Sequence, residues 1–65
     1  MLKENEVIEL LKNALKKYIL NIENSSAYYI EYEGEINAYL NVLNREELEI
    51  KYLDMSKAKE LLKRI

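Results

Sequence analysis

Hydrophobic positions recur every three or four residues near both ends of the chain, which predicts two amphipathic helices. The first covers residues 6–20 and the second covers residues 55–65. Asn5 and Asp54 stand just before these segments and are the expected N-cap residues. The apolar faces are expected to consist of Val7, Leu10, Leu11, Ala14, Leu15, Tyr18 and Ile19 in the first helix, and of Met55, Ala58, Leu61, Leu62 and Ile65 in the second.

Between these two segments the period of the apolar positions changes to two, which predicts half-buried strands. Three strands joined by turns at Gly34 and Asn44 would form an antiparallel meander, with the even-numbered side chains on its buried face. Asn44 and the only glycine of the chain are the residues expected to take left-handed backbone conformations. The inward side chains of this sheet would be Tyr28, Ile30, Tyr32, Ile36, Ala38, Leu40, Val42, Leu48, Ile50 and Tyr52.

The predicted fold is therefore α+β, in the order α-β-β-β-α, with both helices packed on one face of the sheet. A chain of 65 residues makes a single domain, 1–65, with a marginal core. The sequence contains no cysteine or histidine, so disulfides and thiolate or imidazole metal sites are excluded. Association is the remaining way to stabilise so small a domain. We therefore expect a homodimer or a protein that lives bound to a larger partner.

Two tyrosines, Tyr29 and Tyr39, fall on the opposite, odd-numbered face of the predicted sheet. They either stiffen a solvated sheet, as aromatic side chains often do, or belong to a contact surface, where tyrosine is enriched. The functional hypothesis is a non-enzymatic protein–protein interaction module that binds through this acidic, tyrosine-bearing open face. The predicted partner-binding residues are Tyr29, Tyr39, Glu31, Asn37, Glu49 and Lys51.

Charge is segregated along the chain although the net charge is only −2. Residues 23–49 hold seven glutamates and one arginine, whereas 12–17 and 51–65 each carry a net charge of +3. The acidic face would suit a second copy or a basic protein surface. Small inhibitors carried by phages and mobile elements offer an analogy, of size and charge only. The alternative is nucleic-acid binding by a basic helix face, with Lys12, Lys16, Lys57, Lys59 and Lys63 as candidates.

The predicted element order, together with "SKAKELLKRI" at residues 56–65, resembles a double-stranded-RNA-binding domain. In that family, lysines at the start of the second helix reach phosphates and the first hairpin loop enters the minor groove. The resemblance implies RNA contacts by Lys57 and Lys59. The predicted loop "EYEGEI" departs from the family, because its glutamates would repel phosphate.

Few groups are available for catalysis. No histidine can act as a general base or activate a serine, and one glycine cannot form a phosphate-binding loop. We expect no enzyme activity, no cofactor and no small-molecule substrate. The N-terminal segment is charged throughout, so neither a signal peptide nor a membrane span is expected, and the predicted location is the cytoplasm.

Overall fold

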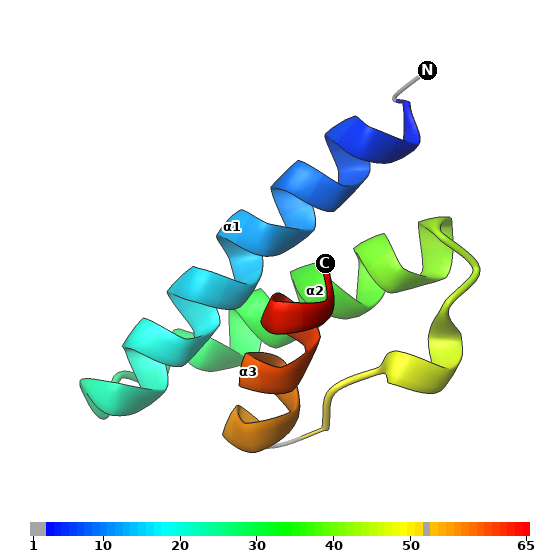
Figure 1. Ribbon diagram of the computed structural model, residues 1–65. Coiled ribbons are helices and arrows are strands. Elements are labelled where there is room, and N and C mark those ends of the chain that lie inside the picture. Colours follow the sequence, from blue (N-terminus) through cyan, green and yellow to red (C-terminus); the bar gives the residue numbers. More distant parts are fainter. Residues whose placement is uncertain (1–2, 52) are drawn as a thin grey trace.

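The computed structural model describes residues 3–51 and 53–65, and within these ranges the chain forms three α-helices and a 3₁₀ turn (Figure 1). Helix α1 spans Glu4–Glu23, α2 spans Tyr29–Val42, the turn η1 spans Glu46–Leu48 and α3 spans Met55–Arg64. Helix α1 packs against both other helices. Helix α2 returns alongside α1 after a short turn, and α3 packs on α1 after the linker that contains η1 (Figure 1).

The predicted α+β fold is wrong, because no residue in 3–51 or 53–65 belongs to a β-strand. The protein is all-α in the part of the chain that the structure describes. The resemblance to a double-stranded-RNA-binding domain is overturned with the meander, because within those ranges no strand hairpin exists to enter a minor groove. The open sheet face proposed for protein binding is likewise absent from the described residues.

The central segment is a helix because its apolar residues also recur at helical spacing. Ile36 and Leu40 are buried in the core, and these two side chains lie on the face of α2 turned toward α1. The partly buried residues around them are Tyr29, Tyr32, Tyr39 and Leu43. Four side chains that the alternation placed inward are instead exposed: Tyr28, Ile30, Ala38 and Val42.

The predicted third strand is replaced by η1 and a short non-helical linker. Leu48 packs against the core and Ile50 is fully buried, so these two side chains do point inward as predicted. The backbone N–H and carbonyl of Ile50 form hydrogen bonds with a side chain and not with a neighbouring strand. Asn37 Oδ1 accepts from the Ile50 N–H at 2.8 Å, and Asn37 Nδ2 donates to the Ile50 carbonyl at 2.9 Å. Tyr52, also predicted inward, lies outside the described residues.

Both terminal helices were predicted correctly from their periodicity. The segment 6–20 lies inside α1, and the segment 55–65 matches α3 to within one residue. Asp54 occupies the predicted N-cap position of α3, although its carboxylate accepts from the Lys51 N–H at 2.8 Å and makes no side-chain capping bond to the helix. The cap position of α1 is Lys3, not Asn5.

Two helices end in left-handed residues that are not glycine. After α1, Ser25 has φ of 57°, and the Ser26 N–H donates to the Asn21 carbonyl at 2.8 Å. After α2, Asn44 has φ of 58°, and the Arg45 N–H donates to the carbonyl of a residue five positions earlier, at 2.8 Å. Both ends are Schellman motifs, in which glycine is the favoured left-handed residue. The prediction that Asn44 is left-handed is confirmed, at a helix end and not in a hairpin.

Replacing Ser25 with glycine is expected to raise the free energy of unfolding by about 0.5–1 kcal/mol, because glycine has no Cβ to clash in the left-handed region. Ser26→Gly is the matched control. It should lower stability, because Ser26 Oγ accepts from the Tyr28 N–H at 3.3 Å and glycine cannot. Urea unfolding followed by circular dichroism measures both changes. An S25G chain no more stable than the wild type would contradict the strain at this helix end.

The core lies where α1, α2, α3 and Ile50 meet. It holds no buried charged side chain among the described residues. Tyr18 is the largest of its fully buried side chains. The buried apolar residues are Val7, Leu11, Ala14, Leu15, Tyr18, Ile36, Leu40, Ile50, Ala58 and Leu61.

Candidate functional site

The two tyrosines predicted to bind a partner sit at the edge of the core. The Tyr29 ring packs edge-on against Tyr18, with the ring centroids 6.2 Å apart and an interplanar angle of 76°. The Tyr39 hydroxyl donates to Glu35 Oε1 at 2.9 Å, and this hydrogen bond raises the pKa of Tyr39. Both side chains are partly buried and pack against the core cluster.

Three more of the predicted residues hold the linker in place. The Asn37 side chain makes two hydrogen bonds to the backbone of Ile50. The Glu49 carbonyl accepts from Lys57 Nζ at 2.6 Å, and the Lys51 N–H donates to Asp54. The sixth residue, Glu31, is exposed on α2. The structure thus does not gather these six side chains on one surface, and any binding role for them stays a prediction.

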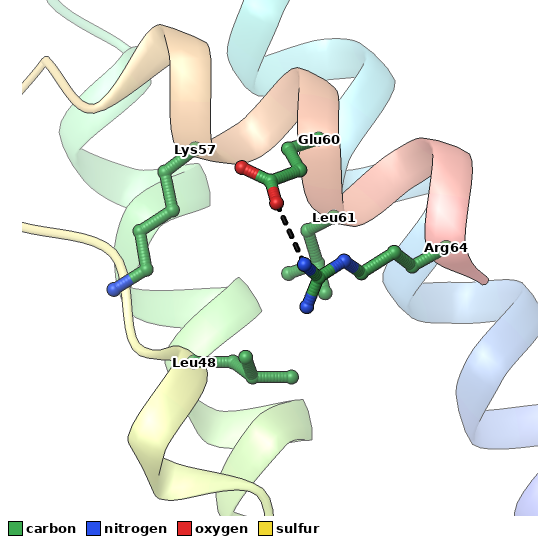
Figure 2. Close-up of a pocket in the computed structure, with 5 residues that line it drawn as sticks. All are labelled: Leu48, Lys57, Glu60, Leu61 and Arg64. Carbon is green, nitrogen blue, oxygen red and sulfur yellow. Dashed lines mark hydrogen bonds and ion pairs between the residues drawn. The ribbon is translucent and has the colours of Figure 1, made fainter.

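The five lysines of the nucleic-acid alternative are divided between α1 and α3. Lys12 and Lys16 share one face of α1, and Lys59 and Lys63 share one face of α3, since each pair is four residues apart. Lys57 lies on another side of α3, toward the linker (Figure 2). Among the basic residues outside this set, Lys17 Nζ lies 5.9 Å from the centroid of the Tyr32 ring.

A small hollow lies between η1 and α3 (Figure 2). Leu48 and Leu61 form its apolar lining, and Lys57, Glu60 and Arg64 stand around it. Arg64 Nη2 donates to Glu60 Oε1 at 2.8 Å, so the rim is partly neutralised. Its volume is about 90 Å³, far below the roughly 300 Å³ of the smallest usual ligand sites. It can receive no more than one side chain.

Two further hollows show no catalytic chemistry. One of about 110 Å³ is lined mainly by apolar side chains of α1, α2 and α3. The other, of about 470 Å³, lies at the turn between α1 and α2, and the polar side chains among its described lining residues are those of Ser25, Ser26 and Tyr29. Within residues 3–51 and 53–65 no group of three potential metal-ligating side chains comes together. The hollows therefore give no candidate for catalysis or metal binding.

The outward face of α2 carries a row of exposed apolar and small residues. We call the four residues Ile30, Gly34, Ala38 and Val42 the α2 ridge, because they follow one another at intervals of four along the helix. All four are exposed. Ile30 and Val42 keep 62% and 65% of their surface in contact with solvent, which puts them among the most exposed large apolar residues of the chain.

Gly34 sits in the middle of this ridge, and no contact with another described residue requires a glycine there. Its φ is not positive, and a Cβ added to it would meet no described atom within 4 Å beyond the backbone of its own helix. Glycine inside a helix costs about 1 kcal/mol relative to alanine. The fold thus carries a destabilising residue at a place where neither backbone conformation nor internal packing requires it. Close approach by another molecule is the remaining structural use of a glycine.

The surroundings of the α2 ridge are acidic at one end only. Glu31, Glu33 and Glu35 all belong to the first half of α2, and the whole helix contains no basic residue. From Ile36 to Arg45 the sequence contains no acidic residue. The ridge therefore runs from an acidic end to a neutral end.

This surface was not predicted, because the predicted strands place Ile30, Ala38 and Val42 on a buried sheet face and Gly34 in a turn. The available signal was the interval of four itself. Residues 30, 34, 38 and 42 are apolar or small, and together with the buried set they cover two sides of one helix.

No described helix is long and apolar enough to cross a membrane. Comparison of the chain with protein-family models, curated proteins and solved structures found no match.

Proposed function

We propose that this protein is a non-enzymatic module that binds an α-helix of another polypeptide through the α2 ridge. Residues at intervals of four form the ridges by which helices pack into one another's grooves, most often at a crossing angle near −50°. Small residues at the crossing point let the two backbones approach closely. Gly34 and Ala38 occupy the centre of the ridge, and Ile30 and Val42 supply apolar area at its two ends.

The observation that carries this proposal is Gly34. A helix that served only to cover the core would gain stability from almost any other residue at an exposed interior position. No described residue fills the space above Gly34, so a larger side chain would be tolerated there. Helix binding gives the glycine a function that offsets its cost.

The test uses two synthetic helical peptides as probes, one copying residues 27–45 of this chain and one an amphipathic sequence of leucine and lysine. Chemical-shift changes in ¹⁵N-labelled protein should concentrate at the α2 ridge with at least one of them. The variant Gly34→Gln should bind that peptide at least tenfold more weakly, because its side chain fills the crossing point. The same variant should be more stable than the wild type by about 0.5–1 kcal/mol, since glutamine is the better helix former.

The matched control is Asn13→Gln, which places the same side chain at an exposed position of α1. It should bind as the wild type does. Shifts spread over other surfaces, or a G34Q chain that binds as tightly as N13Q, would refute the proposal. Because G34Q is expected to fold better than the wild type, loss of binding could not be attributed to unfolding.

A further inference from the structure

We infer that the helix covering the α2 ridge is α2 of a second copy of this chain, packed antiparallel about a two-fold axis. This inference rests on the proposed helix-binding function and names its partner. The arrangement follows from the symmetry of the ridge, the distribution of charge along α2 and the small size of the domain.

The α2 ridge is nearly symmetric about its midpoint. Ile30 and Val42 are equally far from Ile36, and so are Gly34 and Ala38. In an antiparallel pair centred there, each large apolar residue faces the other copy's large apolar residue, and each small residue faces a small one. A two-fold interface requires a patch that complements itself in this way. A ridge with its bulk at one end would not meet that requirement.

The charges of α2 also favour the antiparallel arrangement over a parallel one. In a parallel pair Glu31 and Glu35 would face the same carboxylates of the other copy, which is repulsive. In the antiparallel pair Glu31 faces Asn41, and the acidic half of each helix lies along the half that has no acidic residue. The two helix dipoles then run in opposite directions. Arg45, three residues beyond the C-terminal end of each α2, would lie near the acidic first turn of the other copy.

The size of the face sets the expected strength. A helix of 14 residues is about 21 Å long, and a crossing at its centre brings only the middle turns into contact. The area buried would fall at or below the roughly 1,200 Å² that marks the weak end of specific interfaces. We therefore expect a dimer that forms at micromolar or higher concentration and dissociates on dilution.

Sedimentation equilibrium of the full chain over a range of concentrations tests the second copy directly. The wild type and the control N13Q should shift from the mass of one chain to the mass of two as concentration rises. G34Q should require at least tenfold more protein to reach the same dimer fraction. A wild type that stays monomeric up to millimolar concentration would overturn the inference.

Cysteine cross-linking tests the orientation, and the chain has no cysteine of its own to interfere. A mixture of Ile30→Cys and Val42→Cys chains, treated with a short bismaleimide, should yield the mixed 30–42 product. Chains with I30C alone should cross-link poorly, because in the antiparallel pair the two positions lie about 18 Å apart along the helix axes. Predominant 30–30 product would mean a parallel pair and would overturn the arrangement.

The outcomes separate the two proposals. A monomeric chain whose α2 ridge still binds the leucine–lysine peptide would refute the second copy and leave the helix-binding function in place, with a basic helix as partner. A monomeric chain whose ridge binds neither peptide would refute both.

Discussion

Replacing Asn37 with alanine is expected to lower the free energy of unfolding by about 2–4 kcal/mol, because the change leaves both the N–H and the carbonyl of Ile50 without partners in a partly buried place. Both hydrogen bonds are of good length, at 2.8 and 2.9 Å. The side chain of Ile50 is fully buried between the helices, so its backbone cannot turn to water without removing that side chain from the core. Asn37 therefore fixes the segment around Ile50 to α2. Its side chain satisfies the backbone N–H and carbonyl of Ile50, as a neighbouring strand does in a sheet.

Asn41→Ala is the matched control, because Asn41 lies one turn further along the same helix and is exposed. Its loss should change stability by less than about 0.5 kcal/mol. A domain of this size has a total stability of about 3–10 kcal/mol, so N37A should be markedly less stable than N41A in thermal and urea unfolding. Equal unfolding curves for the two variants would show that the linker contributes little to the fold.

The terminal helices could be predicted because only one period fits their apolar positions. In α1 the buried residues Leu11, Ala14, Leu15 and Tyr18 follow intervals of three and four, and no alternating pattern accounts for them. The same holds for Ala58 and Leu61 in α3. Local pattern and tertiary packing agree in these segments, which is the condition under which periodicity is reliable.

The central segment was mispredicted because two periods coincide in it. Ile36 and Leu40 are four apart, so they satisfy both a helix and an alternating strand. Tyr29 and Tyr39, which the strand interpretation left over, are the residues that distinguish the two, because a helix brings both to the edge of the core. On a sheet, both tyrosines would lie on the solvated face, where they would need a separate explanation.

The interval of four that marks the α2 ridge is present in the sequence, but it indicates a surface only once the segment is known to be a helix. Gly34 is a natural turn residue in a hairpin and becomes unusual only inside a helix, where its cost has to be explained. Likewise Ile30 and Val42 are expected core residues of a sheet and become exposed apolar residues on a helix. Because the segment is a helix and not a sheet, the candidate site consists of Gly34 and its even-numbered neighbours and not of the odd-numbered residues.

Helix α2 therefore has two apolar sides, one buried and one exposed. One side, through Ile36 and Leu40, is buried against the rest of the chain. The other side, the α2 ridge, is exposed and adds nothing to the core. For this reason the two sides of α2 differ little in hydrophobicity. A helix that is apolar on both sides is typical of one that packs against neighbours on both sides.

Replacing Tyr18 with alanine is expected to cost about 3–5 kcal/mol, because it removes the largest fully buried side chain and leaves a cavity among the three helices. This is a large part of the total stability of so small a domain, and the variant should be partly unfolded at 25 °C. Tyr28→Ala is the control, since Tyr28 is 65% exposed and should tolerate the change within about 0.5 kcal/mol. Far-ultraviolet circular dichroism before and during urea unfolding measures both variants, and a fully folded Y18A chain would contradict the central role of this ring.

Removing only the hydroxyl of Tyr18 should not destabilise the protein, in contrast to removing the whole ring. It is buried and makes no hydrogen bond to any described residue, so Tyr18→Phe should keep or slightly raise stability at neutral pH.

Burial raises the pKa of Tyr18 above its ordinary value near 10, although the nearby Asp54 N–H counters part of this. The native state therefore holds this proton more tightly than the unfolded chain does. The stability linked to it is complete below pH 10 and is lost as the pH rises above that value. In urea unfolding between pH 8 and pH 11, the wild type should lose stability more steeply than Y18F, and parallel pH profiles would show that this hydroxyl is not buried in solution.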